Sequence, residues 1–479
     1  MTDRTHARLF VMAVLVLSLV LTLGARAFSL QVTGAEEAQA AAAGNREREL
    51  VVPATRGLIL DQQGRPLATN RVALDVGVSR RELRRQDDDG AAVLDRLAVT
   101  LGIDAATLAA RLRNCGTPDA QPQPNCWNGA PGADPVVADD VGIDAAGVVL
   151  AAPEDYPGVR VVESPVREYP GGTLAAHALG HVGTVTAEDL AEDPGLAGIV
   201  ERGRAGLEQQ YDDVLRGRPG LERIVVDSAG HREGGDLVEP AVPGQTLVTT
   251  IDAELQRVVE EQLAAAMQRA RGRIDKVTER PYRADGGAAV VLDVRTGAVL
   301  ALASAPAFDA NVWTGGISSA DYESLIDAAA GQPLLDRPLA AALAPASTFK
   351  VVSTAAALAA GYPRDGSYAC PSSYRVGGRS FRNYESRAHG FITLARSLEV
   401  SCDTVYYKIA HQLWAADGGS APGTAPKDAI ATTAASFGFG ERTGIDLPGE
   451  TSGLLATRAA KQERWEAQHV AWCERAEHG

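Results

Sequence analysis

The chain has 479 residues, with 46 Lys and Arg against 61 Asp and Glu, which gives a formal net charge of −15. At roughly 100–200 residues per domain, this length allows two or three domains, each with a buried core. Hydrophobic residues make up 45% and charged residues 22%, a balance that excludes a wholly disordered chain. The acidic balance, with five lysines in all, argues against a nucleic-acid groove, so we expect no nucleic-acid partner.

An uncharged apolar run lies close to the N-terminus. Two arginines in residues 1–8 precede it, the run covers residues 9–25, and Arg26 closes it. Seventeen residues at about 1.5 Å each span about 25 Å, the short end of a membrane helix. The positive charges predict that 1–8 is cytoplasmic and that the chain crosses the cell membrane once, with its bulk outside. A cleaved signal peptide is the alternative, since Ala25-Arg26-Ala27 fits the small-x-small cleavage pattern.

Cysteine usage bears on the compartment and on metal binding. Cys115 and Cys126 bracket a loop rich in Pro, Asn and Gln, and an exported loop of this size suits a disulfide. No CxxC pair exists, so we expect neither a metal site nor a cofactor. Cys370, Cys402 and Cys473 are interpreted as buried or unpaired thiols. The odd count leaves at least one cysteine outside any intrachain pair.

The region between the apolar run and residue 270 mixes short strands and helices. Residues 26–48 are rich in Ala and Glu and are predicted to form a stem. From residue 49 onward, local patterns predict paired strands around a turn at Gln63-Gly64, helices, a surface loop and a strand that leads into a helix. The corresponding ranges are 72–78 for a strand, 80–113 for helices, 114–138 for the loop, 209–216 for a helix, 247–251 for a strand and 253–271 for a helix.

The pattern changes around residue 285. Residues 287–293 are a continuous apolar strand, a tight turn follows at Arg295-Thr296-Gly297, and residues 298–304 form a second strand. We expect a hairpin that is buried on both faces. A long helical region is predicted from about 346 to 440, with a basic, Gly-rich interruption at 375–387.

The most informative local motif is Pro345-Ala346-Ser347-Thr348-Phe349-Lys350. The Ala- and Val-rich sequence after Ser347 favours a helix that ends at Gly361-Tyr362-Pro363. Ser347 and Lys350 are three residues apart, which places both side chains on one face of a helical turn. A serine nucleophile needs a neighbouring base, and the N-terminus of a helix supplies N–H donors to an oxyanion. On its own the spacing is weak, because an N-cap serine with a solvated lysine gives the same pattern.

A second polar cluster, Ser401-Cys402-Asp403-Thr404, lies between the helix-like segments 393–400 and 405–414. A hydroxyl with a polar partner two residues later can relay a proton to a nucleophile or a leaving group. S-x-x-K, then S-x-[ND], then K-T-G is the signature of serine acyl-transfer enzymes that act on penicillin-like substrates.

On these motifs the sequence resembles the class B penicillin-binding proteins, the membrane-anchored peptidoglycan D,D-transpeptidases. The resemblance covers nearly the whole chain. The further motifs that carry it are Arg56-Gly57-x-Ile59-x-Asp61, Gly206-Leu207-Glu208, Leu247-x-Thr249-x-Ile251-Asp252, Asp293-x-x-Thr296-Gly297, Phe308-Asp309-x-Asn311 and Phe437-Gly438-Phe439-Gly440-x-x-Thr443-Gly444.

The resemblance implies an α+β protein with an N-terminal transmembrane helix. A β-rich pedestal (dimerisation) domain would cover 49–270 and a partial transpeptidase α/β domain 285–479. Carried over residue by residue, Ser347 is the acylated nucleophile, Lys350 its general base, and Ser401 the hydroxyl of the second motif. Asp403 stands where many relatives have Asn, and this Ser-x-Asp-Thr is more similar to the cell-elongation branch than to the division branch.

The sequence departs from the family in its third motif, because none of the five lysines is followed by Ser-Gly or Thr-Gly. We therefore expect the chain to be an N-terminal portion whose transpeptidase domain lacks its C-terminal strands. Those strands would cover the hairpin at 287–304, which otherwise keeps an unpaired edge. Expressed alone, the 479 residues are expected to react poorly or not at all with penicillin.

The implied function is acyl-serine transpeptidation of D-Ala-D-Ala stem peptides in wall synthesis during elongation. The implied partners are peptidoglycan stem peptides, β-lactams as covalent inhibitors, the membrane, and a glycosyltransferase of the elongation complex. The alternative is a non-catalytic, membrane-anchored scaffold of that complex. A secreted serine β-lactamase is a third hypothesis, although such an enzyme needs neither an anchor nor about 230 residues of pedestal.

Two other sets of polar residues invite functional hypotheses. His177 and His181 are four residues apart, as metal ligands on a helix can be, but Gly180 interrupts the helix and no acidic ligand is adjacent, so we expect a structural role. A pair of catalytic carboxylates, as in glycosidases, could be sought among three aspartates, which we instead place at turns and caps. These are Asp252, Asp293 and Asp309.

Overall fold

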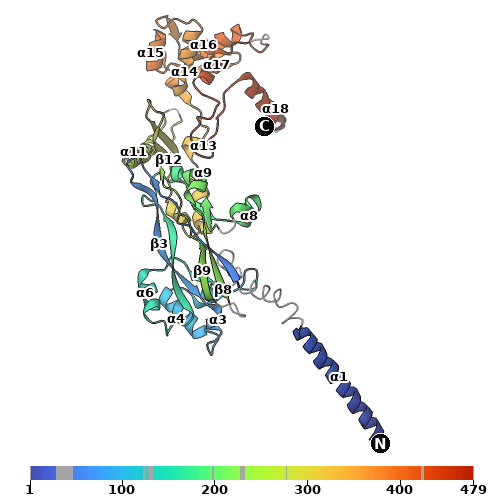
Figure 1. Cartoon of the computed structure of the whole chain (residues 1–479). Coiled ribbons are helices and arrows are strands. Elements are labelled where there is room, and N and C mark those ends of the chain that lie inside the picture. Colours follow the sequence, from blue (N-terminus) through green and yellow to red (C-terminus); the bar gives the residue numbers. More distant parts are fainter. Residues whose placement is uncertain are drawn as a thin grey trace.

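The structure, a computed structural model, describes residues 2–28, 47–121, 126–127, 134–196, 199–226, 232–276, 278–421 and 426–477. The part from residue 47 onward is elongated (Figure 1). Long strands run along its axis, a group of short helices lies at one end, and the helices of the C-terminal part lie at the other. The fold is mixed α and β, as the resemblance implies.

The N-terminal element is α1 (Thr2–Phe28), one long helix. Its residues Phe10–Phe28 have a mean hydropathy of 2.2, and the helix is long and apolar enough to cross a membrane. The predicted run at 9–25 lies within it. Most of the predicted stem, residues 29–46, lies outside the described residues.

The longest strands form the backbone of the first folded part. β3 (Pro66–Val78) pairs antiparallel with β5 (Val159–Glu168) along ten residue pairs. β2 (Ile59–Leu60) pairs with β3 on one side and, in parallel, with β10 (Leu247–Val248), while β4 (Val136–Ala138) pairs with the far end of β3. The predicted strand pair on either side of Gly64 is confirmed as β2 and β3, and Gly64 has the positive φ of 82° that favours glycine in a tight turn.

A second sheet contains β1 (Glu47–Val52), β8 (Gly220–Val226) and β9 (Arg232–Glu239), with β8 in the centre and both pairings antiparallel. Smaller elements connect this sheet to the first. They are α7 (Ala176–Leu179), β6 (Val182–Thr184), α8 (Ala187–Glu192), η2 (Pro194–Leu196), β7 (Glu201–Gly203), α9 (Gly206–Gln210) and α10 (Asp212–Leu215).

The short helices at the far end close a core of their own (Figure 1). Val76, Leu97, Leu108 and Val137 are fully buried within it. The disulfide between Cys115 and Cys126, with Cα atoms 5.0 Å apart, is present as predicted. The helices are α3 (Arg80–Leu83), α4 (Ala91–Leu101), α5 (Ala105–Arg111) and α6 (Ile143–Ala151), which confirms the helical prediction for 80–113.

The long helix α11 (Ala253–Arg271) has the predicted bounds. The Asp252 side chain accepts hydrogen bonds from the first N–H groups of the helix, which otherwise have no partner. Gln256, fully buried, accepts from the Leu302 N–H at 2.7 Å and donates to the Leu302 carbonyl at 2.8 Å. The helix is thereby fixed to the hairpin that follows it in the chain.

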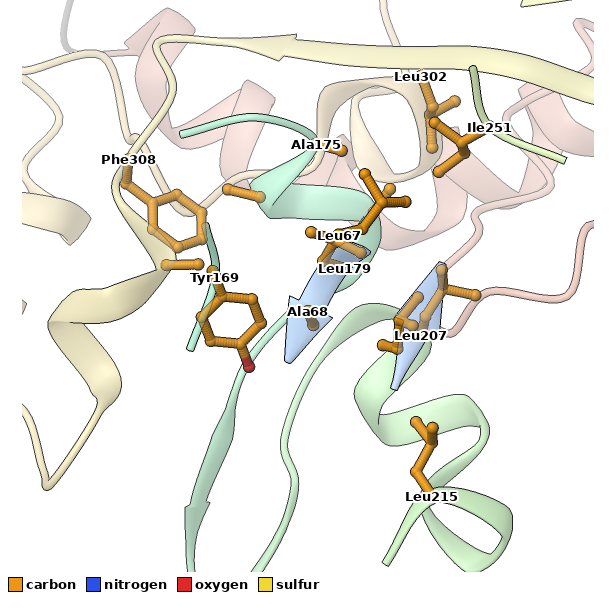
Figure 2. Close-up of a cluster of buried hydrophobic side chains, with 14 residues drawn as sticks. Leu67, Ala68, Tyr169, Ala175, Leu179, Leu207, Leu215, Ile251, Leu302 and Phe308 are labelled. Atoms are coloured by element: carbon orange, nitrogen blue, oxygen red, sulfur yellow. The ribbon is translucent and has the colours of Figure 1, made fainter. Parts of the chain in front are cut away.

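The largest hydrophobic cluster joins the two parts of the molecule (Figure 2). Leu67, Tyr169 and Leu179 come from the first part, while Leu302 and Phe308 come from the segment after residue 285. Because one core draws on both parts, their junction is packed like a domain interior rather than a flexible linker. We name this set the junction core: Ile59, Leu67, Ala68, Tyr169, Ala175, Ala176, Ala178, Leu179, Leu207, Leu215, Ile251, Leu302, Phe308 and Ala310.

The predicted hairpin forms, but not with both faces buried. β11 (Gly287–Leu292) and β12 (Val299–Ala305) pair antiparallel, and β12 is buried from Ala301 onward. In β11, burial alternates: Val290 is 48% and Leu292 52% exposed. The expectation of two buried faces was wrong for this strand, because α11 and α13 (Arg337–Ala340) pack against the hairpin while the outward side chains of β11 have no cover among the described residues.

The C-terminal part is helical, as predicted, but two small two-stranded sheets interrupt it, the hairpin β14–β15 and the pair β13–β16 that encloses it in the sequence. Its own core is small and contains Ala357, Cys370, Leu394, Cys402, Val405 and Ile409. The predicted interruption of the helical region at 375–387 is present, but it is wider, 368–392, and it contains four short strands. The elements are η3 (Ala310–Trp313), α12 (Ser319–Ile326), η4 (Ala346–Phe349), α14 (Lys350–Ala359), β13 (Tyr368–Cys370), β14 (Ser373–Val376), β15 (Arg379–Arg382), η5 (Tyr384–Ser386), β16 (Gly390–Ile392), α15 (Leu394–Glu399), α16 (Asp403–Ala416), α17 (Ala429–Ser436) and α18 (Arg458–Glu477).

Candidate active site

Ser347 lies in a single 3₁₀ turn, η4, that leads directly into α14, so the predicted helix begins three residues later than Ser347. Ala346 before it has a φ of 49°, a left-handed conformation that is costly for a residue with a Cβ atom. The buried face of α14 includes Val352, Ala356 and Ala357, which anchor the helix. As a result Ser347 is exposed to solvent at the end of a fixed helix.

Lys350 is buried, with 7% of its surface exposed, and its ammonium group contacts both predicted serines. Nζ donates to Ser347 Oγ at 3.0 Å and to Ser401 Oγ at 2.8 Å. It also donates to the Ser401 carbonyl at 2.9 Å and forms an ion pair with Asp403 Oδ1 at 2.5 Å. All four residues predicted from the sequence therefore meet around one amine.

Ser401 lies in the turn between α15 and α16, 54 residues after Ser347. Its hydroxyl donates to Ser347 Oγ at 3.1 Å, so the three polar groups of Ser347, Lys350 and Ser401 are in mutual contact. Ser401 also has a positive φ, 53°. Non-glycine residues in this region of the Ramachandran map cluster at functional sites, where the surroundings hold them in place. Asp403 begins α16, where a negative charge interacts favourably with the helix dipole.

Cys402 forms a disulfide with Cys370 of β13, with Cα atoms 6.4 Å apart. Both residues are buried, as one of the two interpretations had it, but they are not free thiols. Pairing over 32 residues depends on tertiary structure that local sequence does not display. Cys473 is a free and exposed cysteine.

Asn383 is a buried residue of the site that sequence reasoning missed. Its Oδ1 accepts from the Thr404 N–H at 3.0 Å, and its Nδ2 donates to the carbonyls of Pro371 and Arg387 at 2.9 and 2.7 Å. It connects three loops around the second motif. The available signal was a single asparagine within the basic, Gly-rich segment, which is too weak to single out.

The histidine pair has a structural environment. His181 stacks on Trp313 with ring centroids 3.7 Å apart, and burial together with Arg204 lowers its pKa from 6.5 to about 4. The His177 ring contacts Phe308 and a ring nitrogen lies 2.6 Å from the Pro333 carbonyl oxygen. Among the described ranges, no group of three or more His, Cys, Asp and Glu residues could hold a metal ion.

The three aspartates lie at turns and caps, as expected. Asp252 caps α11, Asp309 caps η3, and Asp293 accepts the Arg295 N–H in the turn of the hairpin. Each carboxylate accepts hydrogen bonds from backbone N–H groups, which is a structural role. The cluster around Lys350 is the better candidate for catalysis. An exposed hydroxyl in contact with an amine and a second hydroxyl is suited to nucleophilic attack and proton relay.

Known families match both folded parts of the chain. Residues 51–249 match the Penicillin-binding Protein dimerisation domain, and residues 287–468 match the Penicillin binding protein transpeptidase domain. The peptidoglycan D,D-transpeptidase MrdA of Escherichia coli strain K12 is 29% identical over 457 residues, which is 92% of this chain and 64% of that protein. The chain thus spans about two thirds of the length of this curated relative.

Solved structures give the same result. The complex between PBP2 and MreC from Helicobacter pylori matches with a TM-score of 0.67 at 22% identity, covering 88% of this chain and 71% of that one. A peptidoglycan synthase complex that coordinates polymerization and crosslinking contains a chain with a TM-score of 0.61 and 30% identity, covering 97% of this chain and 72% of that one. The two family matches in this order, together with these relatives, show that the chain belongs to the penicillin-binding proteins that join a dimerisation domain to a transpeptidase domain.

Proposed function

We propose that the protein is a serine-type peptidoglycan D,D-transpeptidase of the cell-elongation branch. The observation that carries the proposal is the set of contacts of Lys350 Nζ with Ser347 Oγ, Ser401 Oγ and Asp403 Oδ1. The relatives named as peptidoglycan D,D-transpeptidases support the substrate class. Residues 49–270 would serve as pedestal and residues from 285 onward as the transpeptidase domain.

The reaction divides into two acyl transfers. Ser347 Oγ attacks the carbonyl between the two terminal D-Ala residues of a stem peptide, loses its proton, and displaces the terminal D-Ala. The leaving amine takes up a proton and departs as D-Ala. An amine of a second stem peptide then attacks the acyl-enzyme, forms the cross-link, and returns the proton to Ser347. A β-lactam would acylate Ser347 in the same first step and remain attached.

Each polar side chain has a distinct part in this scheme. Lys350, once neutral, takes the hydroxyl proton of Ser347, which is 3.0 Å away. The Ser401 hydroxyl, in contact with both, relays that proton toward the leaving amine. Asp403 orients Lys350 and compensates its charge when the amine is protonated.

The proposed setting is the outer face of the cell membrane. α1 would anchor the chain with residues 1–8 in the cytoplasm, in agreement with the positive charges that precede the apolar run. Both disulfides lie after α1, and disulfides persist in oxidising compartments outside the cytoplasm. We infer a glycosyltransferase of the elongation complex as partner, by analogy with the relatives found in a PBP2–MreC complex and in a peptidoglycan synthase complex.

Labelling with a fluorescent penicillin tests this function on the full-length gene product in membranes. We expect one covalent label per chain, lost in Ser347→Ala and retained in Ser353→Ala. Ser353 is the matched control because it lies in the same helix, with its hydroxyl bonded to the Phe349 carbonyl. Label that persists in Ser347→Ala would disprove the assignment of the nucleophile.

The second candidate is a non-catalytic, membrane-anchored scaffold of the same complex. The two candidates differ in whether the function of the protein depends on Ser347. If the wild-type protein never acquires label, and Ser347→Ala still supports normal cell shape, the scaffold is the better account. Loss of shape in Ser347→Ala would select the enzyme.

A further inference from the structure

The second active-site turn, Ser401 to Thr404, contains one half of a disulfide that is buried inside a small core of six buried residues. Cys370 is 0% and Cys402 1% exposed. Cys402 lies between the two residues that contact Lys350, so the bond is attached to the turn at its centre. We propose that the Cys370–Cys402 disulfide is a positioning element for acylation, so that the rate of acylation depends on the oxidation state of this pair. The rate claim, though not the positioning itself, rests on the proposed function.

The turn needs such an element because its conformation is unfavourable by itself. Ser401 adopts a φ of 53°, which is unfavourable for a non-glycine residue and persists only when the surroundings impose it. Ser401 itself is exposed to solvent. The core against which its turn packs contains six buried residues, two of which are the disulfide cysteines. A small core provides little packing to hold a strained turn, and covalent links compensate for this.

The disulfide acts together with three hydrogen bonds that lock the same turn. The Cys402 N–H donates to the Ser397 carbonyl at 2.9 Å. The Thr404 N–H donates to Asn383 Oδ1 at 3.0 Å, and Thr404 Oγ1 donates to the Pro371 carbonyl at 2.9 Å. Pro371 follows Cys370 directly, so the disulfide and the hydrogen bond of the Thr404 hydroxyl join the same two segments. Breaking the S–S bond would leave these hydrogen bonds and the contacts of Lys350 with Ser401 to hold the strained turn.

Loss of the bond would act on the chemistry through distance. Reduction adds two electrons and two protons to the pair, supplied by a dithiol that is itself oxidised to a disulfide, and leaves two separate thiols. The turn then relaxes, and the contacts of Ser401 Oγ with Lys350 Nζ and Ser347 Oγ lengthen. Misplacement of a reacting group by about 1 Å costs on the order of 100-fold in rate, while ground-state binding of a β-lactam is little affected.

The chain contains its own matched control. Cys115–Cys126 is a second disulfide, in the short-helix end of the first part and outside the active site. We would compare C370A/C402A with C115A/C126A, both in a Cys473→Ser background that removes the exposed free thiol and prevents mispairing. Saturation kinetics of acylation by a fluorescent penicillin separate the binding constant from the acylation rate constant.

We expect the acylation rate constant to fall about 10- to 100-fold in C370A/C402A, with the binding constant within about threefold, and both to be unchanged in C115A/C126A. If C370A/C402A loses its cooperative unfolding transition, dithiothreitol-treated wild type replaces it. Re-oxidation by oxidised glutathione should then restore the rate. An unchanged rate with the pair broken, or two free thiols at 370 and 402 in peptide mapping of the untreated protein, would overturn the proposal.

Hydrogen exchange gives a readout that needs no activity. The amides of residues 402 and 404 should exchange at least tenfold faster in C370A/C402A, while the amide of Ile409, farther along α16, keeps its protection. Equal exchange at 402 and 404 would overturn the positioning role. If acylation is absent in every variant but the exchange contrast holds, the proposed function fails and the positioning of the turn stands.

Discussion

Two charged groups in this protein are built in opposite ways. Each carboxylate oxygen of Glu208 has an arginine partner at 2.6 Å, one with Arg56 Nε and the other with Arg167 Nε. The Glu208 side chain has no exposed surface. At Lys350, the ion pair with Asp403 is open to solvent on the Asp403 side, which is 24% exposed, and the neighbouring Ser347 is exposed. A saturated buried cluster fixes structure, whereas a cluster with an open side can accept a substrate.

The hydrophobic cores differ in the same sense. The junction core joins residues from Ile59 to Ala310 in one cluster, whereas the core beneath the active-site turn is small and contains a disulfide. We infer that packing holds the junction of the two parts, and that a covalent link supports the active-site turn. Substitutions at the two charged groups should therefore separate stability from activity.

The largest expected effect is on activity. Lys350→Met removes the amine that serves as base, and acylation of the full-length protein by penicillin should fall about 10²- to 10⁴-fold. The unfolding transition should change little, because the Asp403 side chain left behind remains in contact with solvent. Lys408→Met, at an exposed site in α16, is the control and should acylate at the wild-type rate. A similar loss in both variants would argue against the assigned role.

Glu208→Ala should show the opposite behaviour. It leaves the buried guanidinium group of Arg167 without its carboxylate, while Arg56 keeps its ion pair with Asp212, and we expect a cost of about 3–5 kcal/mol of unfolding free energy. Glu399→Ala, which breaks the exposed pair with Arg396, should cost about 0–1 kcal/mol. Denaturant unfolding measures both. Equal costs would contradict the contrast between the saturated and the exposed ion pairs.

His181 should contribute to the pH dependence of the unfolding free energy. Burial and Arg204 lower its pKa from 6.5 to about 4, so the unfolded chain binds a proton at a pH where the folded ring stays neutral against Trp313. Its contribution is therefore present above about pH 6.5 and is lost as pH falls toward 4, by up to about 3 kcal/mol. Between pH 4 and 7, the thermal unfolding midpoint should change less with pH in His181→Gln than in the wild type. An identical pH slope in the two proteins would refute this interpretation.

The smallest expected effect is at Asp403. Its carboxylate lies 2.5 Å from Lys350 Nζ and orients the ammonium group. Asp403→Asn removes the ion pair but keeps a side chain of the same shape that can hydrogen-bond Lys350, so the acylation rate should fall by less than about tenfold, with Ser347 still acylated. A loss as large as that of Lys350→Met, in the same penicillin acylation assay, would show that Asp403 takes part in the proton transfer itself.

Sequence reasoning worked where local chemistry decides the structure. Helix α11 begins after Asp252, an N-cap residue, and its bounds were predicted correctly. The spacing of Ser347 and Lys350 placed both on one turn, since residues three apart face the same side of a helix. The contact of Ser401 with this pair came from the family resemblance, because nothing local joins residues 54 apart.

The remaining features depend on tertiary structure. The Cys370–Cys402 disulfide forms because β13 and the following loops fold back against the second motif. The same arrangement lets Asn383 hydrogen-bond to three separate segments of backbone. The continuous apolar run of β11 suggested two buried faces, yet an apolar strand does not reveal which face a neighbouring helix covers. Pattern alone specified elements and candidate residues, and packing specified their partners.

The most direct measurement of the central claim is the site of the acyl group. The full-length protein would be incubated with a D-Ala-D-Ala stem peptide, quenched, digested and mapped by mass spectrometry. We predict a mass increase equal to the mass of the donor peptide minus that of one free D-Ala, on the peptide that contains Ser347, with release of one free D-Ala per adduct. An adduct on Ser401, or release of D-Ala that survives Ser347→Ala, would contradict the account.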